Sequence, residues 1–166
     1  MKTDKVYLVG FMGAGKSSVA RALARRLDWR AVDIDELIEQ HEHQTVSAIF
    51  AKHGEPHFRA LERTVLMEQI PRRHTVVATG GGTFMDPENQ QAIRLDGMSV
   101  WLDVPLATVV ARIPPDGRRP LSADRAQMER LFAVRQAAYA NADLRVDATV
   151  PAEAIAERII DALKID

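Results

Sequence analysis

What the sequence lacks already narrows the classes of protein to which it can belong. Its 166 residues contain no cysteine, which excludes disulfide bonds, thiolate metal sites and a cysteine nucleophile. No apolar run approaches the roughly 20 residues that a membrane-spanning helix requires. The first strand-like segment begins at Lys5, without the apolar core of a signal peptide before it. We therefore expect a cytoplasmic protein that does not enter a membrane.

An excess of charge of one sign is also lacking. The chain has 22 lysines and arginines against 23 aspartates and glutamates, a net charge of −1. Such a balance creates no overall field that would attract nucleic acid or a membrane surface. The length and the 46% share of hydrophobic residues suit one domain over residues 1–166 with a sizeable core. We expect a monomer that binds small molecules and no nucleic acid.

Short apolar segments alternate with helical patterns along the whole chain. The predicted strands are residues 5–9, 31–34, 75–79, 98–103 and 144–146. They are apolar without interruption, which is typical of a parallel sheet covered on both faces. The predicted helices are residues 17–27, 36–42, 46–52, 56–70, 87–95, 105–112, 125–140 and 152–163. The alternation predicts a three-layer α/β fold, in which ligands bind beyond the carboxyl ends of the strands.

The strongest motif is GFMGAGKS at residues 10–17, between the first predicted strand and the first predicted helix. It fits the phosphate-binding loop pattern G-x-x-x-x-G-K-[ST]. Glycines let backbone N–H groups approach phosphate oxygens, and the following helix adds the positive end of its dipole. Lys16 can reach the terminal phosphates, and the Ser17 hydroxyl can ligate Mg²⁺. An ordinary glycine-rich turn is the alternative, but the strand–loop–helix context favours nucleotide binding.

The second predicted strand ends in Asp33-Ile34-Asp35, which carries two carboxylates. Residues two apart in an extended chain point the same way, so both carboxylates are expected to face one cleft. One can hold a water molecule on Mg²⁺ while the other accepts a proton from a hydroxyl nucleophile. The alternative is that Asp35 only caps the helix that follows.

A glycine triplet, Gly80, Gly81 and Gly82, follows the third predicted strand. Its backbone N–H groups can face an anionic or polyhydroxylated ligand because no side chain intervenes. Arg59 lies near the start of a long predicted helix, and Glu62 three residues later can orient it. The alternative is a solvated ion pair on the helix surface.

An irregular segment, residues 112–122, is marked by prolines and an Asp-Gly pair and carries three arginines, including Arg112 at its start, that have no obvious acidic partners nearby in the sequence. An arginine-bearing flap over a phosphate site would exclude water and steady the transferring charge. An exposed basic loop is the alternative. On the next predicted helix, Arg135 and Tyr139 are four residues apart and form the last candidate pair.

Together these motifs resemble those of the shikimate kinases. The matching features are GFMGAGKS, the Asp33 and Asp35 pair, Phe58-Arg59 with Glu62, the glycine triplet, Arg119-Pro120-Leu121, and Arg135 with Tyr139. They follow the order of that family over nearly the whole chain. The resemblance implies a fold like the nucleoside monophosphate kinases. It has a five-stranded parallel sheet in the order 2-3-1-4-5, helices on both faces and an arginine-bearing lid at about 113–125.

The resemblance also implies a reaction, the Mg²⁺-dependent transfer of the ATP γ-phosphoryl group to the 3-hydroxyl of shikimate in aromatic amino acid biosynthesis. The implied nucleotide-binding residues are Gly13, Ala14, Gly15, Lys16, Ser17, Ser18, Arg112 and Arg119. The implied shikimate-binding residues are Asp35, Arg59, Gly80, Gly81, Gly82 and Arg135, with the binding region at about 34–62. Asp35, Lys16 and Arg119 would be catalytic, and Ser17 with Asp33, through water, would hold one Mg²⁺.

Two other functions remain open from the sequence. Thr83 and Phe84 follow the triplet where that family usually has smaller residues, so the acceptor can be another hydroxylated acid such as gluconate. A nucleotide-binding module without transfer activity is the other alternative, although the NKxD motif of GTPase switches is absent. Two arginines from different helices suit a carboxylate in the acceptor, because arginine binds carboxylates bidentately.

Overall fold

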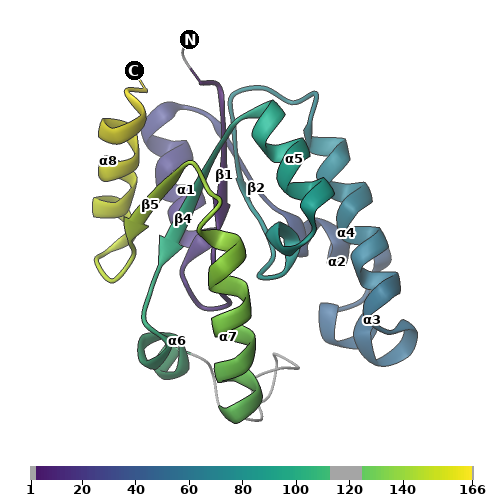
Figure 1. Cartoon of the computed structure of the whole chain (residues 1–166). Coiled ribbons are helices and arrows are strands. Elements are labelled where there is room, and N and C mark those ends of the chain that lie inside the picture. Colours follow the sequence, from purple (N-terminus) through teal and green to yellow (C-terminus); the bar gives the residue numbers. More distant parts are fainter. Residues whose placement is uncertain (1–2, 113–124, 166) are drawn as a thin grey trace.

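The computed structural model describes residues 3–112 and 125–165, and these form one sheet with helices on both sides (Figure 1). The strands are β1 (Lys5–Val9), β2 (Arg30–Asp33), β3 (Thr75–Ala78), β4 (Met98–Asp103) and β5 (Leu144–Asp147). All neighbouring strands are parallel, and their order is β2-β3-β1-β4-β5. The strand order and direction that the resemblance implied are therefore confirmed.

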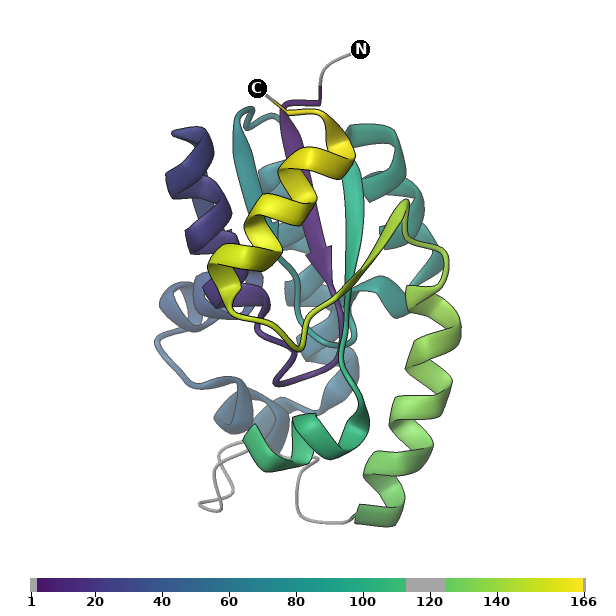
Figure 2. The same cartoon turned by 90° about the vertical axis from the view of Figure 1, so that its left-hand side faces the viewer.

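The helices are placed close to their predicted positions. They are α1 (Lys16–Leu27), α2 (Ile34–Glu42), α3 (Val46–His53), α4 (Glu55–Gln69), α5 (Pro87–Asp96), α6 (Leu106–Arg112), α7 (Arg125–Tyr139) and α8 (Ala152–Leu163). α1 and α8 cover one face of the sheet, and α4 and α5 lie on the other (Figures 1 and 2). The prediction of three layers is confirmed, and only the short 3₁₀ helix η1 (Thr83–Met85) was not predicted.

The register of the three strands at the centre explains where a ligand site can form. Asp33 of β2 pairs with Ala78 of β3, which in turn pairs with Leu8 of β1. Because the strands are parallel, the segments that follow them leave the sheet at one edge. The phosphate-loop motif at 10–17, the second-strand carboxylates and the glycine triplet therefore lie side by side, although they are far apart in the sequence.

The core is built on β1, whose five residues are all buried. The apolar residues of β1, β3 and β4 pack against the inner faces of the helices, including Leu23 of α1 and Ile159 of α8. None of the helices in residues 3–112 and 125–165 combines the length and the apolar character that crossing a membrane would require.

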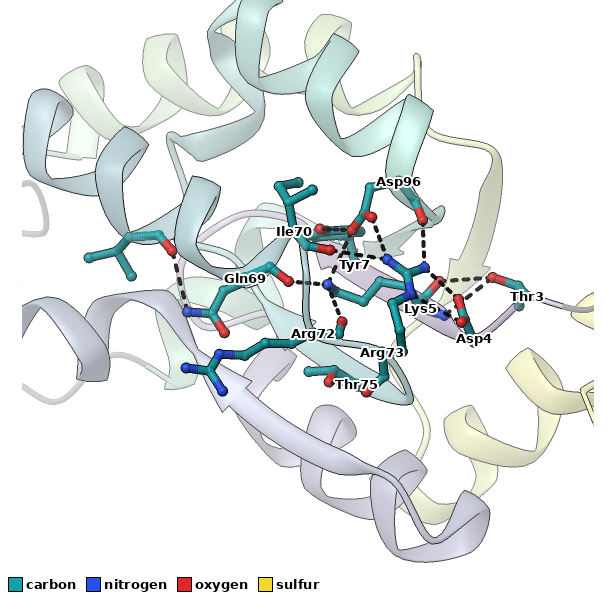
Figure 3. A network of polar contacts seen from close by, with 11 residues as sticks. Thr3, Asp4, Lys5, Tyr7, Gln69, Ile70, Arg72, Arg73, Thr75 and Asp96 are labelled. Carbon is teal, nitrogen blue, oxygen red and sulfur yellow. Dashed lines mark hydrogen bonds and ion pairs between the residues drawn. The ribbon is translucent and has the colours of Figure 1, made fainter.

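A buried polar network ties the opposite, amino edge of the sheet together (Figure 3). Lys5 is fully buried, and its ammonium donates to the carbonyl oxygens of Gln69 and of Arg72, the latter at 2.7 Å. It also forms an ion pair of 3.1 Å with Asp96, to which the Tyr7 hydroxyl donates at 2.5 Å. Burial lowers the pKa of Lys5, although Asp96 partly opposes the shift. The three donors of the ammonium are all used, so this charge is accommodated.

Candidate active site

One cleft of about 570 Å³ opens at the carboxyl edge of the sheet. Predicted site residues from five parts of the chain line it. They are Gly13, Gly15, Lys16, Ser17 and Ser18 from the loop and α1, Asp33 at the end of β2 and Asp35 in α2, Arg59 from α4, Gly80, Gly81 and Gly82 after β3, and Arg135 from α7. The residues predicted for the nucleotide and those predicted for the acceptor thus share one space.

Two of the predicted nucleotide-binding residues that the structure describes do not line this cleft. Ala14 is buried, and its backbone N–H donates to the carbonyl oxygen of Phe11 at 3.1 Å, so it shapes the loop. Arg112 donates to the carbonyl oxygen of Gly13 at 3.0 Å and so lies beside the loop. Arg119 and the predicted lid at 113–125 lie outside the described residues, except for residue 125, so their roles stay predictions.

The loop at 10–17 has the geometry that its sequence predicts. Gly13 and Gly15 have φ values of +77° and +97°, in the left-handed region that favours glycine. α1 begins at Lys16 and has no acidic residue in its first turn, so its N-terminal N–H groups can face an anion. The Lys16 ammonium donates to the carbonyl oxygens of Gly10 and Phe11 at 2.6 and 2.9 Å. The lysine therefore lies across the loop.

Ser17 and Asp33 are brought together as predicted for a metal site. The Ser17 hydroxyl donates to Asp33 Oδ2, while Oδ1 of the same carboxylate accepts from the backbone N–H of Glu36 at 3.1 Å. A hydroxyl and a carboxylate are hard oxygen donors of the kind Mg²⁺ prefers. Within residues 3–112 and 125–165, no three His, Asp or Glu side chains gather as a metal cage. The pair therefore suits an ion that takes its other ligands from phosphates and water.

Asp35 faces the same cleft, but the reason predicted for this was wrong. β2 ends at Asp33 and α2 begins at Ile34, so the two carboxylates do not belong to one extended segment. Asp33 is the N-cap of α2, and Asp35 lies in the first turn of that helix. The capping role considered for Asp35 thus belongs to Asp33. The Asp35 carboxylate is placed in the cleft by the first helical turn.

The glycine triplet lets three predicted acceptor-binding side chains approach the backbone. A Cβ atom on Gly80 would lie 2.8 Å from Asp35 Oδ1, and one on Gly81 would lie 2.9 Å from Arg135 Nη1. A Cβ atom on Gly82 would lie 2.5 Å from both terminal nitrogens of Arg59. A side chain at any of these positions would displace one of the three groups, so Asp35, Arg59 and Arg135 converge on this one segment.

The backbone N–H groups of the triplet are not all directed as predicted. The Gly80 N–H donates to Thr83 Oγ1 at 2.9 Å, so it is used within the protein and does not face a ligand. Thr83 and Phe84 are both buried, and neither lines the cleft. The expectation that Thr83 and Phe84 shape the acceptor pocket directly is not supported.

Arg59 and Glu62 form a partly buried pair, so the alternative of a solvated surface pair is wrong. The Arg59 guanidinium donates to Glu62 Oε1 at 3.0 Å, and the Glu62 side chain is only 1% exposed. A second acidic residue, Glu55, accepts from Arg59 at 3.3 Å. Glu62 thus orients Arg59, as the three-residue spacing predicts.

Arg135 is the more deeply buried of the two arginines, with 5% exposure. Its guanidinium carbon lies 5.7 Å from the centre of the Phe11 ring, a cation–π contact. Burial lowers the pKa of Arg135, and the nearby Arg59 lowers it further, although arginine remains charged. The Tyr139 hydroxyl donates to the carbonyl oxygen of Gly81 at 2.5 Å. Two guanidinium groups that repel each other beside the triplet favour an anionic ligand between them.

Thr83 is the site residue that sequence reasoning missed as a hydrogen-bonding group. Its hydroxyl contacts both Gly80 and Glu62, which belong to different elements. Its position three residues after Gly80 is the one local signal, since a hydroxyl at that spacing can accept from a backbone N–H in a turn. Glu62 could not be foreseen as its second partner because only packing brings α4 to this turn.

Comparisons with known proteins agree with this geometry. A family model described as shikimate kinase matches residues 12–164. A shikimate kinase from Persephonella marina is 43% identical over 142 residues, covering 85% of this chain and 87% of the relative. One from Geobacter metallireducens is 44% identical over 147 residues, covering 87% and 82% of the two chains.

Solved structures give the same result. The shikimate kinase from Acinetobacter baumannii in complex with shikimate superposes with a TM-score of 0.93 at 32% identity, covering 98% of this chain and 93% of that one. A deoxyadenosine kinase from M. mycoides, at 16% identity and a TM-score of 0.64, shares the fold alone. On the family match and these identities, the chain belongs to the shikimate kinase family.

Proposed function

We propose that this protein transfers the γ-phosphoryl group of ATP to the 3-hydroxyl group of shikimate, giving 3-phosphoshikimate for aromatic amino acid biosynthesis. One observation carries the proposal. A single cleft joins a phosphate-binding loop to a carboxylate, two arginines and a glycine triplet facing it. The membership of the family and the likeness to a relative solved with shikimate support the same reaction.

On the donor side, we assign ATP to the loop and the start of α1. Backbone N–H groups of residues 13–18 would hold the β- and γ-phosphates, with Lys16 pairing the terminal charges. Ser17, and Asp33 through water, would hold one Mg²⁺, which when bound neutralises charge on the phosphates. Arg112, beside the Gly13 carbonyl, would lie near the adenine.

On the acceptor side, we assign the shikimate carboxylate to Arg59 and Arg135, which approach the triplet from α4 and α7. Arginine binds a carboxylate through two parallel hydrogen bonds, which fixes the ring as well as its charge. Asp35 would accept a hydrogen bond from the reacting hydroxyl and take its proton as the new bond to phosphorus forms. The glycine segment leaves space for the ring beside these groups.

Three further assignments complete the proposal. The acceptor-binding region would cover about 34–62, and residues 113–125, which lie outside the described residues except for residue 125, are assigned as a lid from which Arg119 would steady the charge on the transferring group. The protein would act as a cytoplasmic monomer of one kinase domain, on ATP and shikimate and on no nucleic acid.

The reaction is tested by following ADP release with shikimate, gluconate and nucleoside monophosphates as acceptors. Of these acceptors, we expect only shikimate to give turnover well above the ATPase background. Phosphorus NMR of the product should locate the new phosphate on the 3-hydroxyl. No turnover with shikimate would contradict the proposal, and a faster rate with gluconate would favour the other acid. Calorimetry showing nucleotide binding but no acceptor binding would favour a module without transfer activity. Thr83 and Phe84 no longer favour gluconate, because neither lines the cleft.

A further inference from the structure

Thr83 lies outside the cleft lining and connects two parts of the acceptor site, the glycine triplet and α4. It is the first residue of η1 and is fully buried. Its hydroxyl oxygen accepts from the backbone N–H of Gly80 at 2.9 Å and donates to Glu62 Oε2 at 2.8 Å. A carboxylate can only accept, so the single proton of the hydroxyl is committed to Glu62. The threonine itself is held, because Asn89 donates to its carbonyl oxygen at 3.0 Å.

Glu62 needs this second contact. Its side chain is 1% exposed, and a buried carboxylate is costly unless its oxygens are paired. Arg59 Nη1 donates to Oε1 at 3.0 Å and to Oε2 at 3.2 Å, and Thr83 supplies the other donor to Oε2. Without the hydroxyl, the carboxylate would be held by the arginine alone and could turn with it.

Arg59 is sensitive to such a movement. Its side chain is 29% exposed, so it extends from the buried carboxylate toward the cleft. Its terminal nitrogens lie where a Cβ atom on Gly82 would be, only 2.5 Å from that position. Because the guanidinium is packed so closely on the triplet, a small rotation of Glu62 changes which way its N–H groups point.

We propose that Thr83 is a positioning residue for the acceptor. Its hydroxyl links the Glu62 carboxylate to the Gly80 backbone by hydrogen bonds, and Glu62 in turn orients the Arg59 guanidinium toward the acceptor carboxylate. The inference rests on the proposed function, in which Arg59 binds that carboxylate. Loss of the Thr83 hydroxyl should therefore weaken shikimate binding and not ATP binding, because none of the hydrogen bonds described for Thr83 reaches the phosphate loop.

The test compares three variants by steady-state kinetics and urea unfolding. Thr83→Val keeps the shape and removes the hydroxyl, whereas Thr83→Ser keeps the hydroxyl. Thr75→Val is the matched control, because Thr75 is equally buried at the far end of β3 and donates to the carbonyl oxygen of Arg73 at 2.9 Å. Thr83→Val should raise the KM for shikimate about tenfold and leave the KM for ATP unchanged. Thr83→Ser should stay close to the wild type, and Thr75→Val should lose stability without changing either KM.

Arg59→Ala, measured in parallel, separates the two proposals. If Arg59→Ala leaves the shikimate KM unchanged, the assignment of Arg59 is wrong and the role of Thr83 falls with it. If Arg59→Ala raises that KM while Thr83→Val and Thr83→Ser behave alike, the site stands and the positioning role is overturned. An equal rise in both KM values for Thr83→Val also overturns it. Should Thr83→Val fail to fold, Thr83→Ala replaces it and is judged against Thr83→Ser in the same way.

Discussion

The proposed role of Asp35 as general base can be tested by replacing one carboxylate oxygen with an amide nitrogen. The side chain lines the cleft from the first turn of α2, with Oδ1 close to Gly80. In Asp35→Asn the shape is kept, but the amide can no longer accept the proton of the reacting hydroxyl. We expect kcat to fall by at least ~10²-fold, the usual contribution of a general base, when ADP release is measured with saturating shikimate.

The control is Asp161→Asn, a change of the same kind on the exposed side of α8, which should leave kcat unaltered. An Asp35→Asn enzyme with normal kcat but a raised shikimate KM would make Asp35 a binding group. That outcome is physically possible because a loose phosphoryl-transfer transition state requires little deprotonation of the nucleophile.

Two glycines that look alike in the sequence should respond differently to alanine. Gly82 has φ near −104°, which alanine tolerates, and its Cβ would displace only the flexible end of Arg59. The Cβ of Gly97→Ala would instead lie 2.6 Å from the backbone oxygen of Lys5, on the central strand. Gly82→Ala should therefore raise the shikimate KM at least about tenfold with little loss of stability. Gly97→Ala should cost about 1–3 kcal/mol of unfolding free energy and leave KM unchanged.

Steady-state kinetics measure the shikimate KM of both variants, and urea unfolding measures their stability. A reversed pattern, with Gly82→Ala unstable and Gly97→Ala impaired in binding, would mean that the close approaches at the triplet are not what requires glycine there.

At the scale of elements, the amino edge of the sheet is held by charge as well as by apolar packing. Lys5 of β1 binds carbonyl oxygens that follow or end α4, and Asp96 at the end of α5 (Figure 3). Arg73 also pairs with Asp96, at 2.6 Å. The network fixes the far ends of α4 and α5 to the central strand, while the other end of α4 carries Arg59.

Lys5→Met tests this anchoring. The variant keeps most of the length of the side chain but leaves the carbonyl oxygens of Gln69 and Arg72 without their buried donor. We expect a loss of about 3 kcal/mol in unfolding free energy, measured by urea unfolding near pH 7. Arg25→Met, which breaks an exposed pair with Glu153 on the helix surface, should cost less than about 1 kcal/mol. Equal losses for the two variants would show that the buried network adds nothing beyond an ordinary surface pair.

At the scale of the whole molecule, stability at alkaline pH should depend on the two tyrosines of the chain. Tyr7 and Tyr139 are both fully buried, and burial raises the pKa of each well above the usual value. The neutral form is therefore favoured by folding. Its stabilising contribution is complete below the unfolded pKa of about 10 and is lost as the pH rises from there toward the folded pKa values.

Urea unfolding over a series of alkaline pH values, with tyrosinate absorbance and circular dichroism, measures this dependence. The absorbance should rise only as the fold is lost, and Tyr7→Phe and Tyr139→Phe should each make the decline in stability less steep. Comparison with these variants is needed because the lowered pKa of Lys5 acts in the opposite sense at lower pH, up to its unfolded value of about 10.4, where the decline due to the tyrosines begins. Tyrosinate appearing while the dichroism is still native would contradict the expectation.

Much of the fold and part of the site follow from local patterns. The strands and helices lie close to their predicted ranges because apolar runs and helical periodicity are properties of contiguous residues. The two carboxylates were predicted to share a cleft for a reason that failed, since α2 begins one residue after Asp33. The Gly80 N–H was predicted to face a ligand but bonds Thr83 instead. That bond depends on the conformation of the turn, which three consecutive flexible glycines do not specify by themselves.

By itself, the sequence determined the phosphate loop, the order of strands and helices, and the edge at which a ligand would bind. These depend on backbone conformations and periodicities within short segments, so they can be read without knowing the neighbours. Only the tertiary structure decided that Asp35, Arg135 and Arg59 fill the space left open by Gly80, Gly81 and Gly82. It also decided that Thr83 meets Glu62. Those contacts join side chains from separate helices, and their distances are set by the packing of α2, α4 and α7 around the sheet.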